Sequence, residues 1–316
     1  MGFETRKRAP LPNPGPFLAE VTNHLDPTYM GGLEVALIKG SHGWGEFSPF
    51  LEYDDAESSH WLASAIEAAT QPRPKLFRSS VAVNGTIPAL NDVAQLQSIV
   101  ESFPGVKSFK VKVGVNRAED LERVNVIRNL RPEAKIRVDV NGLWSVDQAE
   151  DFLTSVGEVE YVEQPCQSLE ELRELKKRVS VKIVGDEILR KAEDPFDINL
   201  DGAVDYLMLK VQPLGGIGRA HALAKHHKLP VVVSSALESA VGINYGLTLA
   251  ASFEEMSFDC GLATGSLLAQ DVAHLPITDG MMQISEFEPQ LDGLDVAPDR
   301  FEWWKNRIMR TAELLK

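Results

Sequence analysis

The sequence predicts an α/β protein built on a closed parallel barrel, with a small companion domain at the N-terminus. Short apolar runs recur about every 23–26 residues from Ser80 onward, and a polar, helix-like stretch follows each run. Eight such runs suit a closed barrel of alternating strands and helices. The chain has 316 residues, of which 44% are apolar, enough for one large domain and a small second one.

The overall charge and the cysteines narrow the classes of function. A formal net charge of -14 argues against nucleic-acid partners and against anionic membrane surfaces. It leaves room for a small anionic substrate, because local cationic groups can dominate a cleft. Cys166 and Cys260 make neither a disulfide framework nor a zinc-type spacing. No run is long enough for a membrane span and residues 1–25 lack a signal-peptide core, so we expect a cytoplasmic protein.

The first 70 residues predict a mixed α and β unit. Residues 33–39 alternate as a strand does, and the glycine-rich stretch 40–45 predicts a hairpin turn. A helix is expected over residues 58–69, capped at Ser58 or Ser59. The proline-rich segment 71–74 ends that helix and marks a domain boundary.

The barrel strands and helices are then read off in order. The eight predicted strands are Val81–Asn84, Phe109–Val113, Ile136–Val140, Glu160–Glu163, Lys182–Gly185, Tyr206–Val211, Pro230–Ser234 and Phe258–Ala263. The clearest predicted helices are Asn116–Leu130, Val146–Val156, Leu169–Val179 and Gly218–His227. A doubly wound open sheet is the runner-up, although no glycine-rich dinucleotide fingerprint follows the first strand. The tail, residues 301–316, predicts a helix that packs on the small N-terminal domain.

The second predicted strand carries two lysines on one face. In Phe109–Gly114 the side chains alternate, so Lys110 and Lys112 point the same way. Two ammonium groups so close together need acidic neighbours, and their mutual repulsion favours a neutral amine that can act as a base. An exposed edge strand that carries lysines for solubility is the alternative reading of this stretch alone.

Acidic side chains end the next three strands, and a further lysine lies on the sixth. Asp139, Glu163 and Asp186 are 24 and 23 residues apart, and Lys210 follows 24 residues later. One strand–helix unit separates each pair, so these groups can converge at the carboxyl ends of the barrel strands. Three adjacent carboxylates repel one another, and a hard divalent cation such as Mg²⁺ removes that repulsion. Taken singly, such an acid is more often a helix cap or a salt-bridge partner.

A metal between two amines suits removal of a proton next to a carboxylate, because the cations stabilise the enediolate that forms. The K-x-K stretch, the three acids and the sixth-strand lysine resemble the enolase superfamily in its muconate-lactonizing subgroup. Four short sequence motifs are more specific: residues 79–85 (SSVAVNG), 163–165 (EQP), 185–187 (GDE) and 234–239 (SSALES). These motifs resemble those of the o-succinylbenzoate synthase family of menaquinone biosynthesis.

This resemblance implies a (β/α)7β barrel, a modified TIM barrel, with an α+β N-terminal capping domain. Residues 1–78 would form the capping domain, on which the tail 288–316 packs, and residues 79–287 would form the barrel. The implied reaction is the Mg²⁺-dependent syn dehydration of 2-succinyl-6-hydroxycyclohexa-2,4-diene-1-carboxylate to 2-succinylbenzoate. Mn²⁺ is expected to substitute for Mg²⁺.

The resemblance also implies roles for single residues. Lys112 takes the α-proton and returns it to the leaving hydroxide, Lys210 stabilises the enediolate from the other face, and Asp139, Glu163 and Asp186 hold the metal. The substrate contacts implied are Lys110 and Asn141 for the ring carboxylate, Arg137 beside Lys112, and Ser234, Ser235 and Gly261 for the succinyl carboxylate.

Outside these positions, residues 215–218 (GGIG) follow the sixth strand and could present backbone N–H groups to an anion; a tight turn is the alternative.

Three rival functions remain at this stage. An N-succinylamino acid racemase or a dipeptide epimerase would use the same lysine pair, one amine on each face. A Schiff-base lyase would use Lys210 as the covalent amine but leave the carboxylates unexplained. A non-catalytic barrel is the third, and the oligomeric state is not predicted.

Overall fold

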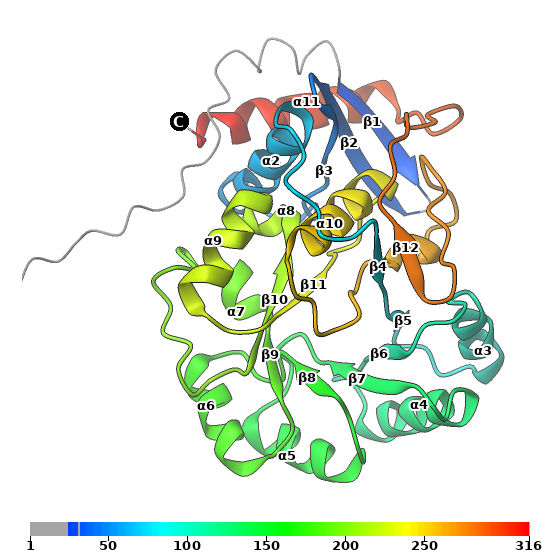
Figure 1. The fold of residues 1–316 in the computed structure, drawn as a ribbon, viewed down its shortest axis with the longest axis vertical. Coiled ribbons are helices and arrows are strands. Elements are labelled where there is room, and N and C mark those ends of the chain that lie inside the picture. The colour runs from blue at the N-terminus through cyan, green and yellow to red at the C-terminus, as the bar shows by residue number, and fades with distance from the viewer. Residues whose placement is uncertain (1–24, 31, 316) are drawn as a thin grey trace, which may run out of the picture.

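The computed structural model of the protein describes residues 25–30 and 32–315. One end of the molecule holds a three-stranded sheet with α2 and α11, and a curved parallel sheet with its helices forms the rest (Figure 1). The elements in chain order are β1 (Leu25–Met30), β2 (Leu33–Gly40), β3 (Gly43–Phe47), α2 (Asp55–Thr70), β4 (Ser80–Ala82), β5 (Gly85–Ile87), α3 (Val93–Glu101), β6 (Ser108–Lys112), α4 (Arg117–Leu130), β7 (Lys135–Asp139), α5 (Val146–Ser155), β8 (Tyr161–Glu163), α6 (Leu169–Arg178), β9 (Ile183–Gly185), α7 (Glu187–Arg190), β10 (Tyr206–Lys210), α8 (Val211–Leu214), α9 (Ile217–His227), β11 (Val231–Ser234), α10 (Ala240–Ser252), the 3-10 helix η1 (Thr264–Leu267), β12 (Met281–Gln283) and α11 (Pro298–Glu313).

The small sheet at the N-terminal end is antiparallel, in the order β1-β2-β3. The predicted strand and hairpin are confirmed, and the turn consists of Ser41 and His42. Gly45 lets β3 lie directly on α2, since a Cβ at this position would overlap the backbone carbonyl of Ala65. The predicted unit therefore exists in the described residues; its first 24 residues lie outside them.

The helix α2 begins earlier than its predicted start. Asp54 is the N-cap, and its Oδ1 accepts a hydrogen bond of 2.8 Å from the backbone N–H of Glu57. Ser58 and Ser59 lie inside the helix, where their hydroxyls donate to the carbonyls of Asp54 and Ala56. The predicted serine cap is wrong: the helix begins earlier, at Asp54, a residue type that caps helices as well as serine does.

The C-terminal helix α11 packs on this unit. Its Trp304 and Ile308 are fully buried in one apolar cluster with Phe47 and with Trp61 of α2. The predicted tail helix is confirmed and begins three residues earlier, at Pro298, a residue that suits the first helical position. The division of the chain at residues 78 and 287 remains a prediction.

The large sheet is parallel throughout, in the order β11-β10-β9-β8-β7-β6-β5. Its two edges are joined by one short extended segment: Cys260 bridges Val83, and Gly261 bridges Ser234. The hydrogen bonds include Gly261 N–H to the carbonyl of Val233 at 2.9 Å and Cys260 N–H to that of Ala82 at 2.7 Å. The predicted parallel barrel is confirmed as a fold class, and the bridged edges exclude the doubly wound open sheet.

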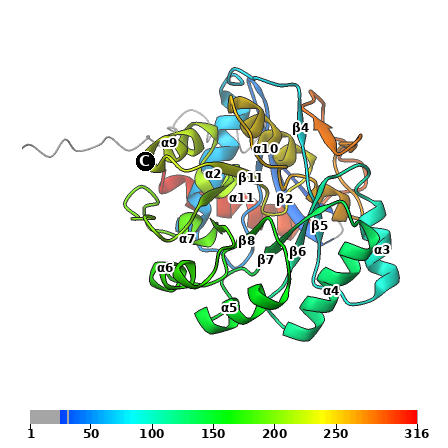
Figure 2. The ribbon, with the colours of Figure 1, turned by 60° about the horizontal axis from the view of Figure 1, so that its bottom comes forward.

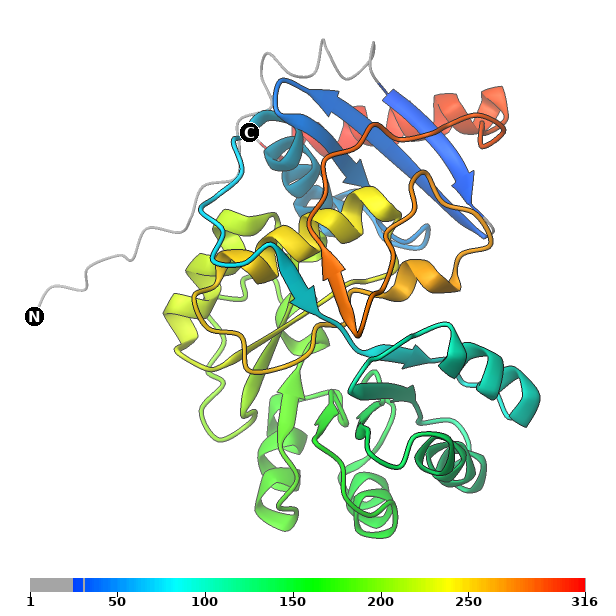
Figure 3. The same ribbon diagram turned by 45° about the vertical axis from the view of Figure 1, so that its right-hand side comes forward.

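The first and last predicted strands differ from the structure. Residues 81–84 divide between β4, which pairs antiparallel with β12, and the approach to β5, which pairs with β6 (Figure 3). Residues 258–263 form only the two bridges, not a regular strand. Both segments lie where the barrel closes, and a single apolar run does not show which neighbour will pair with it.

The outer helices α4, α5 and α6 lie outside the curved row of strands β6, β7 and β8 (Figure 2). Their predicted ranges agree within one residue at each end. Nearly every residue of α10 is buried, so no amphipathic pattern marks it in the sequence. Within the described ranges, no helix is both long and apolar enough to cross a membrane.

Candidate active site

Three buried carboxylates end neighbouring parallel strands. Asp139 closes β7, Glu163 closes β8, and Asp186 directly follows β9; each is at most 1% exposed. Asp139 and Glu163 are paired in register across β7 and β8. The predicted convergence of these acids at the carboxyl ends of the strands is thus observed.

Lysine ammonium groups flank and bridge this row of acids. On the β6 side, Lys112 Nζ lies 2.7 Å from Asp139 Oδ2. Lys110 Nζ lies 3.1 Å from the same oxygen and 2.9 Å from Glu163 Oε2. On the β10 side, Lys210 Nζ lies 2.5 Å from Asp186 Oδ2 and 3.8 Å from Glu163 Oε1. Lys112 and Lys210 therefore stand at opposite ends of the acid row.

The pKa values of Asp139 and Glu163 are shifted in opposite directions. Burial alone would raise the pKa of Asp139, but Lys110 and Lys112 outweigh it and hold that pKa below its ordinary value. Burial, followed by the neighbouring Asp139 carboxylate, raises the pKa of Glu163 to about 7. Glu163 Oε1 is buried and has no hydrogen-bond partner. The positive charges of the lysines therefore do not offset the burial of Glu163 and its repulsion by Asp139.

The donor set at the acid row fits a hard divalent cation. All three candidate ligands are carboxylates, the type of ligand that Mg²⁺ prefers, and the free oxygen of Glu163 offers a ligand without loss of a hydrogen bond. Within the described part of the chain, no group of three acidic, histidine or cysteine side chains forms a ready-made metal site. The lysine amines occupy the space between the carboxylates instead, so a cation would replace ammonium contacts.

Asn141 belongs to the same site. It adopts a left-handed backbone conformation with φ 53°, which is more accessible to asparagine than to most residues. Its Oδ1 accepts a hydrogen bond of 2.8 Å from Lys112 Nζ, and its Nδ2 donates to Glu187 Oε1 at 3.1 Å. Asn141 therefore orients the Lys112 amine.

Ser234, Ser235 and Gly261 lie together next to Lys210. Ser234 is the register partner of Lys210 across β10 and β11. Both serine hydroxyls donate to the carbonyl of Gly261, at 3.2 Å and 2.9 Å. A Cβ at Gly261 would overlap the Ser234 hydroxyl in its present orientation, so glycine lets the two segments approach closely. These three predicted residues are grouped at the Lys210 end of the site.

Arg137 is not where the sequence analysis expects it. Its register partner is Lys110, not Lys112, and its guanidinium forms an ion pair of 2.6 Å with Glu160, the residue before β8. It also donates to Asn84 Oδ1 and to the carbonyl of Asp259. The expected position beside Lys112 is wrong, because the long side chain turns toward the acidic amino-terminal ends of the strands.

Two further residues organise the site. Gln164 is buried, with φ 38°, and its Oε1 accepts hydrogen bonds from the N–H groups of Asp186 (3.0 Å) and Ile188 (3.2 Å). Arg190 lies 3.3 Å from Asp186 and donates at 2.8 Å to the hydroxyl of Tyr53, which comes from the N-terminal unit. In the sequence, the motif EQP at residues 163–165 could have identified Gln164 as a site residue. Arg190 carries no such signal because Tyr53 is 137 residues away.

Comparison with known proteins shows which families this chain resembles. Residues 92–301 match the family described as enolase C-terminal domain-like, and residues 33–69 match the one described as enolase N-terminal domain-like. The o-succinylbenzoate synthase of Mycobacterium ulcerans is 47% identical over 292 residues, covering 89% of this chain and 88% of the relative.

Solved structures agree on the fold. A dipeptide epimerase from Enterococcus faecalis superposes with a TM-score of 0.70 at 19% identity, covering 85% of this chain and 96% of that one. The same epimerase complexed with Mg and the dipeptide L-Leu-L-Tyr has a TM-score of 0.67 at 18% identity, with coverage of 86% and 96%.

The fold and the matching domains define an enolase-type barrel enzyme with a small N-terminal domain. The chain belongs to the enolase superfamily and, within it, to the o-succinylbenzoate synthase family. The predicted family and fold class are thereby confirmed.

Proposed function

We propose that the protein catalyses the syn dehydration of 2-succinyl-6-hydroxycyclohexa-2,4-diene-1-carboxylate to 2-succinylbenzoate, as a hydro-lyase of menaquinone biosynthesis. The observation that carries the proposal is the row Asp139, Glu163 and Asp186 with Lys112 at one end and Lys210 at the other. The family membership supports the same choice.

In the proposed reaction, Lys112 as a neutral amine removes the proton from the carbon that bears the ring carboxylate. The resulting ammonium then gives that proton to the hydroxyl group leaving the adjacent carbon. One H and one OH leave together as water, and the ring becomes aromatic. The Lys112 side chain is 34% exposed, whereas those of Lys110 and Lys210 are 6% and 8% exposed, so Lys112 has the better access to a bound ring.

Lys210 serves as a fixed positive charge on the other side. Burial lowers its pKa, but the Asp186 and Glu163 carboxylates outweigh burial, and the net pKa is raised. A protonated amine stabilises negative charge on the substrate but is a poor nucleophile, so a raised pKa disfavours the Schiff-base alternative.

Asp139, Glu163 and Asp186 would hold the Mg²⁺ ion, and Mn²⁺ remains the expected substitute. When bound, the metal supplies positive charge next to the substrate carboxylate as its α-proton leaves. Lys110 and Asn141 would orient the ring carboxylate, and Ser234, Ser235 and Gly261 the succinyl carboxylate. The buried, unpaired thiols of Cys166 and Cys260 are consistent with the proposed cytoplasmic location.

A racemase or epimerase is the second candidate, since a lysine lies at each end of the acid row and the solved neighbours include a dipeptide epimerase. Purified protein with Mg²⁺ should be assayed for ultraviolet absorbance change on the cyclohexadiene substrate, and by polarimetry on N-succinylamino acids and dipeptides. Fast dehydration is expected. Fast racemisation or epimerisation without dehydration would replace the proposal by its rival.

A further inference from the structure

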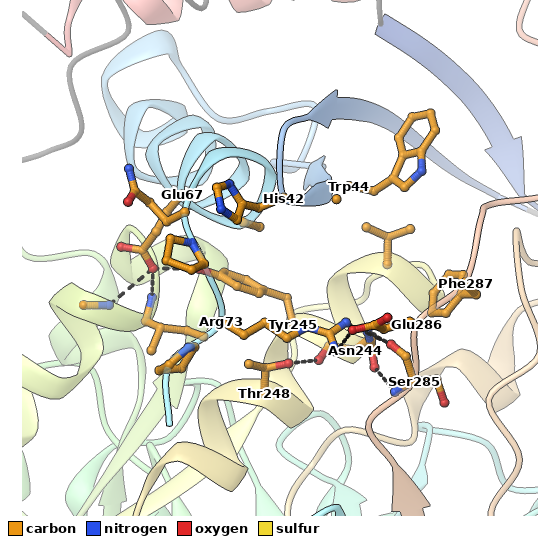
Figure 4. Close-up of a pocket in the computed structure, with 18 of the residues that line it drawn as sticks. His42, Trp44, Glu67, Arg73, Asn244, Tyr245, Thr248, Ser285, Glu286 and Phe287 are labelled. Carbon is orange, nitrogen blue, oxygen red and sulfur yellow. Dashed lines mark hydrogen bonds and ion pairs between the residues drawn. The ribbon is translucent and has the colours of Figure 1, made fainter. Parts of the chain in front are cut away.

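A carboxylate from the N-terminal unit lies at the start of the barrel helix α9. Glu67 of α2 lines a cavity of about 970 Å³ between the two parts of the molecule, and its carboxylate contacts the start of α9 at the side of this cavity (Figure 4). Its Oε1 accepts hydrogen bonds from Ile217 N–H (2.5 Å), Gly218 N–H (3.3 Å) and the hydroxyl of Tyr245 (2.6 Å). The GGIG stretch therefore does present N–H groups to an anion, and that anion is the protein's own Glu67.

A second carboxylate from the same unit lies at the start of α10. Glu46 of β3 is 3% exposed and accepts hydrogen bonds from the N–H groups of Ser239 (3.2 Å) and Gly242 (2.9 Å), and from the Ser239 hydroxyl. Its Oε1 also accepts from Gln212 Nε2 at 3.3 Å. Both oxygens of Glu46 are thus used as acceptors by barrel donors.

Helix α10 also has its own cap, Ser239, whose Oγ accepts a hydrogen bond from Val241 N–H at 3.2 Å, so Glu46 adds a second acceptor there. The helices on the other side of the barrel begin at caps of their own. The helices α4, α5 and α6 begin at their own side-chain caps, Asn116, Ser145 and Ser168. The N-cap of α9 is Gly216, which has no side chain, and a Cβ there would lie 2.6 Å from Glu67 Oε1. Unpaired N–H groups at a helix start need an acceptor, and a carboxylate also complements the helix dipole.

These two helices follow the strands of the Lys210 end of the site. The strand β10 ends at Lys210 and leads through α8 into α9, and β11 ends at Ser234 and leads through Ser235 into α10. The N-terminal unit is therefore attached to the two loops that carry Lys210 and the grouped serines.

We propose that Glu46 and Glu67 are positioning residues: by capping α10 and α9 from the N-terminal unit, they hold the loops after β11 and β10 where the succinyl carboxylate binds. This inference rests on the proposed function for the identity of the substrate. It assigns the two residues no contact with substrate or metal.

The test compares Glu46→Gln and Glu67→Ala with the controls Glu302→Gln and Glu302→Ala, which remove an equally negative charge from an exposed site on α11. At position 46 a glutamine keeps only one acceptor oxygen, and its NH2 group faces N–H and O–H donors. At position 67 an alanine removes Oε1, the oxygen that all three donors share. Because a displaced substrate loop weakens binding, we expect KM to rise about tenfold with kcat within about threefold of wild type. Partial misfolding alone would lower apparent kcat and leave KM unchanged.

Amide hydrogen exchange provides a second readout that needs no substrate. Exchange should quicken at residues 217 and 218 in Glu67→Ala and at residues 239 and 242 in Glu46→Gln, with no change in the two Glu302 variants. Unchanged exchange overturns the capping role, and faster exchange with unchanged KM overturns the positioning role. If buried Glu46→Gln fails to fold, the variant Glu67→Ala at a half-buried position carries the same test. Should the wild type fail to dehydrate the diene, the proposed function fails separately, and KM is measured for an N-succinylamino acid, which carries the same succinyl group.

Discussion

Lys112 and Asp139 face each other across β6 and β7, with 2.7 Å between Nζ and Oδ2. The Asp139 side chain is fully buried and the Lys112 side chain is 34% exposed. This pairing orients the Lys112 amine, while about a third of the side chain stays accessible. A base that must meet a substrate needs both properties.

Replacing Lys112 by alanine should lower kcat by roughly 10³-fold, because loss of a positioned general base typically costs 10²–10⁴-fold. The matched control is Lys107→Ala, which removes an exposed lysine at the start of the same strand. Steady-state rates and thermal midpoints of both variants check the prediction. A Lys112→Ala enzyme within tenfold of wild type would contradict the assignment of the base.

Mg²⁺ should stabilise the protein through the acid row. At a free concentration of 100 Kd, a ligand that binds only the folded state adds ~2.7 kcal/mol to the free energy of unfolding. Glu163→Gln should reduce this gain, since the amide supplies only one oxygen ligand and no charge. Glu133→Gln, at an exposed position, should keep the full gain. Thermal melts with Mg²⁺ and with EDTA measure the effect, and identical melts for the wild type would rule out the metal site.

Arg137 should prove a structural residue. Its guanidinium pairs with Glu160, which is 13% exposed, and lies 4.9 Å from the ring centroid of Tyr161. Removing one partner of a buried ion pair typically costs ~3–5 kcal/mol, so Arg137→Met should lower the free energy of unfolding by about 3 kcal/mol, given that Lys135 also contacts Glu160. Denaturant titration measures this loss.

The rate–pH profile separates the two roles of Arg137. The conservative variant Arg137→Lys should leave the acidic limb of the profile in place, because no contact joins Arg137 to Lys112. A displaced acidic limb would restore the expectation that Arg137 tunes the catalytic amine.

Stability should fall as pH rises toward 8 because of Glu238. Burial, and next the Glu46 carboxylate, raise the pKa of Glu238 to about 8, above its ordinary 4.5. In the unfolded chain the group ionises first as pH rises, so the folded state is favoured below pH 4.5 and loses that advantage up to pH 8. Each pKa unit corresponds to about 1.4 kcal/mol, so the total is on the order of a few kcal/mol.

Glu238→Gln should flatten this pH dependence, since the neutral amide resembles the protonated acid and does not titrate. Denaturant unfolding at pH 5, 6.5 and 8 measures the slope, with Glu302→Gln as a variant expected to keep the slope of the wild type. Equal slopes in Glu238→Gln and the wild type would show that Glu238 is ionised in the folded protein at neutral pH.

Local sequence patterns predicted the strands and helices that belong to the regular strand–helix alternation. Strands β6 to β11 and helices α4, α5 and α6 alternate at nearly constant spacing, and the acids and lysines follow from that spacing. The predictions fail at the barrel closure and at α10, because pairing partners and complete burial depend on segments far away in the chain. The start of α2 was misplaced for a different reason: Asp54 and Ser58 are both acceptable caps, and local sequence does not rank them.

The sequence by itself determined which residues could reach the mouth of the barrel: one acid or amine per strand–helix unit, from Lys112 to Lys210. The alternation of side chains along a strand and the constant strand–helix spacing can both be recognised in the sequence, without knowledge of the folded structure. Only the tertiary structure decided where each long side chain turns and what it meets. Arg137 turns toward Glu160, and Glu46 and Glu67 reach barrel helices more than 140 residues away. Such contacts depend on the packing of distant segments, which no local pattern encodes.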